Sequence, residues 1–237
     1  QFDMVYVPGV GEVAISISSD PEDELIEHTI RIVGRTTRVI EGLGVGDVLG
    51  VRGPFGVGWP MQEARWKDVV VVTGGLGCAP VTGAIEYIIR RRESYGHVTI
   101  VHGVKKPADL VYRERFEAWA RQRDTRVLLT TDEPDRAWRD RSGVVTELFD
   151  EIEFDPERTI LLMCGPEVMM RYASANLRAR GLPAQRAAAI RAAQRRRASA
   201  SPGRAPRRSS VRGHSLRADS EPAPAPRAAR AATRRPT

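Results

Sequence analysis

The spacing of hydrophobic residues along the chain changes near position 66. Before that point, apolar segments at 2–7, 13–18, 28–33 and 47–52 are separated by turns rich in Gly and Pro, which predicts short strands. Closely spaced short strands with such turns favour a barrel or a sandwich. We therefore expect an antiparallel β-domain over residues 1–62.

From residue 66 to residue 183, apolar runs alternate with helix-like segments. The apolar runs lack a period of two, which suits strands that are buried on both faces of a sheet. The segment therefore predicts an α/β domain with a parallel sheet and helices on both sides. The expected strands are 69–73, 97–102, 126–131 and 159–164, and the expected helices are 81–92, 112–121, 144–151 and 168–180.

Residues 184–237 differ in composition from the rest of the chain. Ala, Arg, Pro and Ser dominate, Lys and aromatic residues are absent, and Asp219 and Glu221 are the only acidic residues. Such a segment buries too little apolar surface to offset its ordering entropy, so we expect a disordered tail, apart from a short helix over 184–197. Three interpretations stay open: a basic arm that binds nucleic acid, an inert linker, or a frameshift in a GC-rich gene. We favour the frameshift, since out-of-frame GC-rich codons give this composition, and we do not expect nucleic acid as a partner.

Charge, cysteine content and hydropathy exclude several classes of protein. The net charge of +7 comes from the tail, so residues 1–183 are mildly acidic, and no apolar run approaches the roughly 18 residues of a membrane span. The two cysteines, Cys78 and Cys164, are too few for a disulfide framework or a four-cysteine metal site. The histidines show no zinc spacing. We expect a cytoplasmic protein without a metal ligand set, and, because the chain begins with Gln1, a first domain that is N-terminally incomplete.

A glycine-rich turn connects the first strand of the α/β segment to its first helix. Residues 73–80 read TGGLGCAP. A strand that ends in such a turn and leads into a helix presents backbone N–H groups and a positive helix end to a phosphate. Pro80 lies where a missing N–H costs little. The turn predicts nucleotide binding, although a plain structural turn is the alternative interpretation.

Two further motifs accompany this turn, RGPFG at 52–56 and CGP at 164–166. The ordered set resembles the ferredoxin-NADP reductase superfamily. Within it, the chain is most similar to the flavin- and nicotinamide-binding subunits of NAD(P)-linked hydrogenases (sulfhydrogenase gamma type), anaerobic sulfite reductase and dihydroorotate dehydrogenase. The resemblance covers residues 1–183. It implies a flavin-binding barrel followed by a NAD(P)-binding α/β domain over 66–183, with FAD and NAD(P) as cofactors.

The resemblance assigns flavin-binding positions in the first domain. Segment 13–18 would contact the flavin, although relatives carry an arginine where this chain has Val13. Taken alone, that segment reads as an ordinary amphipathic strand, Arg31 as a solvated residue and 53–56 as a plain turn. The implied flavin-binding residues are Ile15, Ser16, Ile17, Ser18, Thr29, Ile30, Arg31, Thr36, Thr37, Gly53, Pro54 and Gly56.

In the second domain, the resemblance places NAD(P) on the glycine turn and Cys164 near the nicotinamide, as the catalytic candidate. Buried inert thiols are the alternative for both cysteines. Asp132 would bond a ribose or an amide, and Lys105 and Lys106 would either pair with a 2′-phosphate or face solvent, so NAD and NADP both stay open. The implied nucleotide-binding residues are Gly74, Gly75, Gly77, Cys78, Ala79, Pro80, Asp132, Cys164, Gly165 and Pro166.

The implied function is that of a flavin-dependent oxidoreductase subunit. It would transfer hydride between NAD(P)H and FAD and exchange electrons with an iron–sulfur partner, such as a hydrogenase subunit, in a hetero-oligomer. Relatives hold a [2Fe–2S] cluster with cysteines after the CGP helix, but no cysteine follows Cys164 here, so we expect no cluster and a tail that replaces that segment. A nucleotide-binding sensor or inactive remnant is the main alternative, and an arginine-tail nucleic-acid binder is a third.

Overall fold

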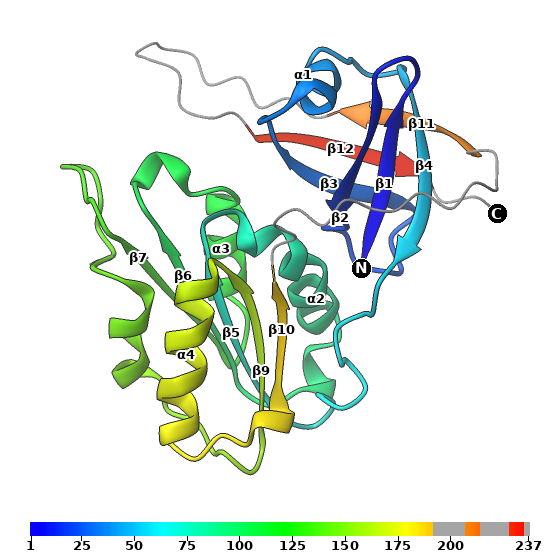
Figure 1. The fold of residues 1–237 in the computed structure, drawn as a ribbon. Helices are drawn as coiled ribbons and strands as arrows, with labels where there is room; N and C mark the ends of the chain where they lie inside the picture. Colours follow the sequence, from blue (N-terminus) through cyan, green and yellow to red (C-terminus); the bar gives the residue numbers. More distant parts are fainter. Residues whose placement is uncertain (192–206, 214–227, 235–237) are drawn as a thin grey trace. The chain divides into compact units, whose positions relative to one another are not determined.

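The computed structural model describes residues 1–191, 207–213 and 228–234 of the chain. These residues form two compact units (Figure 1). The first contains Gln1–Gly58 and the two last strands, and the second begins at Trp59. In the described part of the chain, no helix has the length and apolar character that crossing a membrane would require.

The first unit is an antiparallel sheet whose strands follow the order β2-β1-β4-β11-β12-β3. An isolated antiparallel bridge between Ile17 and His28 joins the two outer strands, so the sheet closes on itself as the expected barrel. Its core contains Val5, Ile30 and Leu49. The strands are β1 (Phe2–Val7), β2 (Gly11–Ser16), β3 (Leu25–Arg31), β4 (Val48–Phe55), β11 (Arg207–Gly213) and β12 (Ala228–Arg234), and a short helix, α1 (Arg35–Glu41), follows β3.

Three segments of the tail differ from the expected disorder. β10 (Ala187–Arg191) pairs in parallel with a strand of the second unit, β11 pairs with β4, and β12 pairs with β3. Composition misses such strands because a ladder is held by backbone N–H and C=O groups, whichever side chains they carry. Of the expected helix over 184–197, residues 184–186 form a 3₁₀ turn and 187–191 form β10, and the remainder lies outside the described residues. The frameshift concerns the gene and stays a prediction.

The second unit is built on a parallel sheet with the order β10-β9-β5-β6-β7-β8. The expected strands are confirmed, and β8 (Arg141–Ser142) is added. Residues 145–151, expected as an α-helix, form a 3₁₀ helix, η4 (Val145–Glu151). The other elements are β5 (Asp68–Gly74), α2 (Ala79–Arg90), β6 (Val98–Val104), α3 (Arg113–Ala120), β7 (Thr125–Thr131), β9 (Thr159–Gly165) and α4 (Glu167–Ala179).

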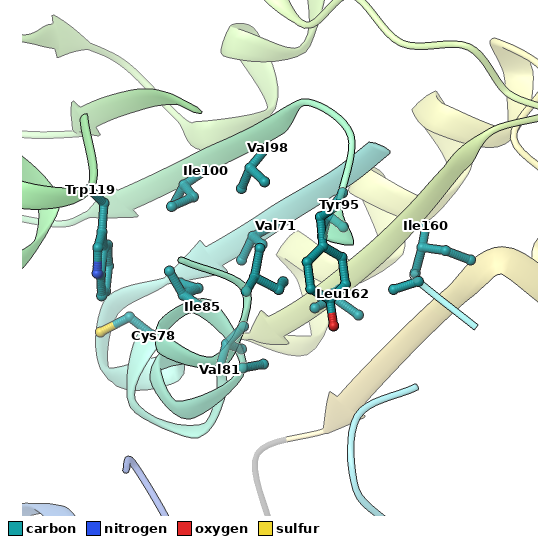
Figure 2. Close-up of a cluster of buried hydrophobic side chains, with 14 of the residues drawn as sticks. Val71, Cys78, Val81, Ile85, Tyr95, Val98, Ile100, Trp119, Ile160 and Leu162 are labelled. Carbon is teal, nitrogen blue, oxygen red and sulfur yellow. The ribbon is translucent and has the colours of Figure 1, made fainter. Parts of the chain in front are cut away.

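Two apolar cores cover the two faces of this sheet. On one face, α2 and α3 pack on alternate residues of the strands, and Figure 2 shows Val71 and Ile100 of the sheet beside Val81 and Ile85 of α2. On the other face, α4 and η4 pack over the intervening residues, which include Val72 and Leu161. Burial on both faces explains why the strands lack alternation in the sequence. The carboxyl ends of the strands therefore lie side by side along one edge of the sheet.

Candidate functional site

The glycine turn and the CGP motif meet at the carboxyl edge of the parallel sheet. Thr73 at the end of β5 pairs in register with Cys164 of β9 on one side and with His102 of β6 on the other. The turn then continues as a short 3₁₀ segment, Gly75–Cys78, directly into α2. The edge outside the carboxyl ends of parallel strands is where open α/β sheets bind ligands.

Glycine is required at this meeting point because the two motifs touch through their backbones. A Cβ on Gly77 would collide with the carbonyl group of Cys164 and would lie 2.8 Å from the Cα of Gly165. A Cβ on Gly74 would lie 2.6 Å from the sulfur of Met169 and 3.1 Å from Pro166. The backbones of Gly77 and Cys164 therefore touch directly, while the Met169 side chain packs against both Gly74 and Gly165.

The turn also presents the start of a twelve-residue helix. Gly75 has a φ of +53° with nothing within 4 Å of the position a Cβ would take, so its conformation and not a close neighbour calls for glycine. Pro80 lies in the first turn of α2, and Trp59 donates its indole N–H to the Pro80 carbonyl at 2.8 Å. Backbone N–H groups and the positive end of α2 thus point out of the sheet edge, which is an arrangement that binds phosphate.

Both thiols lie at this edge and both are buried. Burial raises the pKa of Cys78 to about 12 and that of Cys164 to about 11. At neutral pH each is therefore an uncharged thiol, which makes it a weak nucleophile. The Cys164 side chain packs in the core on the α2 face with no exposed surface, and its surroundings do not activate it for covalent chemistry.

His102 is a buried residue of this edge that the sequence analysis considered only as a zinc ligand. Its Nδ1 shares a hydrogen bond of 2.8 Å with the Thr73 hydroxyl, and its ring stacks on Phe116 with centroids 4.9 Å apart. Burial lowers its pKa to about 4, so the ring is neutral at physiological pH. Its Nε2 has no hydrogen-bond partner within the described residues. In the sequence, His102 is marked only by its place at the end of an apolar strand. That position does not predict its contact with Thr73.

Asp132 follows β7 at the same edge of the sheet and is exposed. Its backbone N–H donates to the carbonyl of Val104 at 3.0 Å, which continues the ladder between β6 and β7. Lys105 and Lys106 follow β6 and both lie within ion-pair distance of Glu133, a residue that the sequence analysis did not single out. The structure therefore brings Asp132 and the two lysines together beside neighbouring strand ends.

In the first unit, several of the residues implied for flavin are used to hold the barrel. Ile15 and Ile30 pack in its core, and Val13 lies beside them. The Ser18 hydroxyl donates to that of Thr29 at 3.2 Å, and both side chains are buried. Ile17 donates its N–H to the carbonyl of Gln1 at 3.2 Å. The Ser16 carbonyl contacts Nδ1 of His28 at 3.0 Å, and Nε2 of that ring lies 3.3 Å from the Asp3 carboxylate.

A turn and a strand end complete the flavin positions. The buried Thr37 hydroxyl accepts the N–H groups of Val33 and Gly34 at 3.0 and 2.9 Å, so it shapes the turn before α1. Thr36 lies near Gly11, where a Cβ would be 3.6 Å from its hydroxyl. The segment expected as a turn is the end of β4, which still pairs with β1 at Phe55 after a shift of register. Gly53 is needed there because a Cβ would collide with the Asp3 carboxylate. The Gly53–Pro54 peptide bond is cis, and Gly56 has a φ of +79°.

Three exposed arginines lie on either side of the turn after β3. Arg31 ends the strand, and Arg35 and Arg38 lie on α1. Guanidinium groups pair with phosphate oxygens through two parallel N–H donors. These side chains are therefore of the type that pairs with a diphosphate such as that of FAD, and the sequence analysis did not single out Arg35 and Arg38. No group of three or more His, Cys, Asp or Glu in the described ranges is arranged to hold a metal ion.

Known proteins share this arrangement. Residues 71–175 match the family described as Oxidoreductase NAD-binding domain. The sulfhydrogenase 2 subunit gamma of Pyrococcus furiosus is 33% identical over 194 residues, which cover 77% of this chain and 67% of that protein. A probable dihydroorotate dehydrogenase B (NAD(+)) electron transfer subunit of Methanocaldococcus jannaschii is 29% identical over 72% of this chain and 59% of its own length.

A solved structure shares the fold. The ferredoxin NADP+ reductase from Neisseria gonorrhoeae, determined with bound FAD and NADP, superposes with a TM-score of 0.66 at 21% sequence identity and covers 81% of this chain and 85% of its own. At 21% identity, this similarity supports a shared fold alone. The relationship in sequence is shown by the two relatives named above. The chain belongs to the ferredoxin-NADP reductase superfamily of NAD-binding oxidoreductases.

Proposed function

We propose that this chain is a flavin-dependent oxidoreductase subunit that transfers hydride between NAD(P)H and FAD. One observation carries the proposal: the turn 74–78 and the motif 164–166 pack backbone to backbone at the carboxyl edge of the parallel sheet, as nucleotide binding requires. FAD, when bound, supplies a centre that accepts a hydride and gives up electrons one at a time. The relatives named above are a hydrogenase gamma subunit and an electron transfer subunit.

The chain's own residues position the cofactors. The glycines at 74, 75 and 77 let the backbone approach a pyrophosphate, and the N-terminus of α2 attracts its charge. Gly165 and Pro166 border the place beside the turn, and the buried Cys164 would support, from below, the surface that the nicotinamide contacts. Asp132 would bond a ribose, while Arg31, Arg35 and Arg38 pair with the diphosphate of FAD. Hydride transfer needs no general acid or base, so placement is the protein's main contribution.

The electron partner is proposed to be an iron–sulfur protein in a hetero-oligomer. A [2Fe–2S] cluster needs four ligands, and the sequence contains only two cysteines, both buried at the nucleotide-binding edge. Electrons leaving the flavin would therefore go to a cluster held by another subunit, such as that of a hydrogenase. We also propose a cytoplasmic location, where free thiols persist.

A second candidate is a sensor that binds nucleotide without turnover. It is favoured by Val13, whose side chain packs against the barrel core at the position where the resemblance implies an arginine. Without an arginine at this position, fewer guanidinium groups would pair with the diphosphate, so the protein would retain FAD less tightly.

Reduction of bound flavin distinguishes the two candidates. The full chain is purified with added FAD, and the flavin absorption band is followed under anaerobic conditions as NADH or NADPH is added. We expect the protein to retain flavin and the band to bleach. A protein that binds NAD+ in calorimetry but stays colourless after desalting supports the sensor, and a protein that binds neither molecule refutes both.

A further inference from the structure

Lys105, Lys106 and Glu133 form a charged cluster at the sheet edge. The Lys105 Nζ lies 3.4 Å from one carboxylate oxygen of Glu133, and the Lys106 Nζ lies 3.4 Å from the other. One carboxylate is therefore shared between two ammonium groups. All three side chains are largely exposed, so a ligand can reach them.

The backbone beneath this cluster is held in place. The Glu133 N–H donates to the Lys105 carbonyl at 2.9 Å, and the Thr131 hydroxyl donates to the same carbonyl at 3.0 Å. On the other side, the Lys106 N–H donates to the Asp109 carboxylate at 3.3 Å. The lysines and Glu133 therefore extend from a fixed frame that continues the ladder between β6 and β7.

The position of the cluster relative to the glycine turn suits the adenosine end of a dinucleotide. β6 is the direct neighbour of β5 in the sheet, and β7 follows β6. Neighbouring strands are about 4.8 Å apart, so the end of β7 lies about 10 Å from the end of β5. A dinucleotide whose pyrophosphate lies on the glycine turn reaches this distance with its adenosine ribose.

Glu133 reduces the positive charge that the cluster offers to an additional phosphate. Both lysines lower the pKa of Glu133, through hydrogen bonds and through their charge, so the carboxylate is ionised at neutral pH. It contacts both ammonium groups and cancels one of their two charges. A 2′-phosphate placed there therefore meets weaker attraction than two free lysines would give, and it is repelled by the carboxylate.

We propose that Glu133 makes this protein select NAD over NADP, because it occupies the two lysines that would otherwise bind a 2′-phosphate. This inference rests on the proposed function, which places the nucleotide on the glycine turn. A 2′-hydroxyl group needs only a hydrogen-bond acceptor, which Asp132 would supply. The two lysines alone would predict a preference for NADP, so the Glu133 carboxylate that they share decides the preference for NAD.

Calorimetry with two adenosine nucleotides tests the proposal without bound flavin. The full chain is titrated with 5′-AMP and with adenosine 2′,5′-bisphosphate, which differ by the 2′-phosphate. We expect the wild type to bind 5′-AMP more tightly. The variant Glu133→Gln keeps the size of the side chain and should bind the bisphosphate about twofold to fivefold more tightly than the wild type, as expected for exposed charge pairs. Its affinity for 5′-AMP should stay the same.

Three controls separate this proposal from simpler effects. In Glu133→Gln, the further replacement of Lys105 and Lys106 by Gln should abolish the gain, and so should high salt, which screens exposed charges. Glu157→Gln removes an acid paired with Arg186 elsewhere on the same unit and should change neither affinity. Tighter binding of the bisphosphate by the wild type, or an unchanged ratio in Glu133→Gln, would overturn the specificity proposal while nucleotide binding itself stands. If NAD+ and both probes fail to bind, the proposed function fails first and this inference with it.

Discussion

Gly77 lies directly against the backbone of Cys164, so that a Cβ on Gly77 would come 2.7 Å from the Cys164 carbonyl carbon. These residues belong to motifs that are far apart in the sequence and meet only through the pairing of β5 with β9. The contact fixes how far the glycine turn extends beyond the carboxyl edge of the sheet. A ligand on the turn is therefore held at a defined position relative to Cys164.

The variant Gly77→Ala tests this contact. The added methyl group meets backbone atoms, which cannot rotate away, so the free energy of unfolding should fall by about 1–3 kcal/mol. Urea denaturation of the full chain gives this value. Gly75→Asn is the matched control, because it changes a glycine of the same turn where nothing is near and Asn tolerates positive φ. Equal losses in the two variants would mean that the close packing is unimportant.

The hydrogen bond between Thr73 and His102 predicts a difference between two substitutions. Thr73→Val keeps the shape of the side chain but leaves Nδ1 of a buried ring without its partner, which should cost about 1–3 kcal/mol of unfolding free energy. Thr73→Ser keeps the hydroxyl and should cost clearly less. The comparison is made by thermal and urea denaturation at neutral pH. A Val variant as stable as the Ser variant would show that the bond contributes nothing.

The lowered pKa of His102 predicts that the protein loses stability in mild acid. The folded ring titrates at about 4 and an unfolded histidine near 6.5, so between these values the unfolded state binds more protons. The contribution is complete above pH 6.5 and is lost as the pH falls to 4, to a total of about 3 kcal/mol. Denaturation midpoints across this range measure it. In His102→Gln this part of the pH dependence should disappear, and an unchanged slope would assign it to other groups.

The raised thiol pKa values predict slow alkylation of the native protein. At pH 8 both Cys78 and Cys164 are protonated and buried, so iodoacetamide should label neither within a time that fully labels the protein in urea. Mass spectrometry of the two cysteine peptides gives the rates. Rapid labelling of native Cys164 would instead indicate an activated thiolate.

The proposed support of the nicotinamide by Cys164 predicts a kinetic effect. Cys164→Ala should slow flavin reduction by NADH in stopped-flow measurements, because the cavity left by the thiol loosens the CGP motif that would support the nicotinamide, while the flavin content stays the same. Cys78→Ala removes the other buried thiol and serves as the matched control, with a smaller effect expected. If both variants reduce flavin as fast as the wild type, Cys164 has no role in placing the nicotinamide.

The strands β5, β6, β7 and β9 could be predicted from the sequence because burial on two faces imposes continuous apolar runs such as 69–72 and 160–163. By contrast, η4 was expected as an α-helix, and the two-residue strand β8 was not expected. The helix α1 was missed because its seven residues contain little apolar periodicity and its start depends on Thr37, which accepts two backbone N–H groups. The strands β10, β11 and β12 were missed because their pairing partners lie in other parts of the chain.

The glycine turn and the CGP motif could be identified in the sequence by their Gly and Pro residues, although of the turn glycines only Gly75 has a positive φ, and Gly74 and Gly77 are required by neighbours that the fold supplies. Only the tertiary structure brought Gly77 against Cys164, His102 against Thr73, and Glu133 between Lys105 and Lys106. These contacts join residues on different strands, and register between parallel strands is set by packing across the whole sheet. Local sequence therefore determined which backbone shapes are available, and the sheet decided which side chains share an environment.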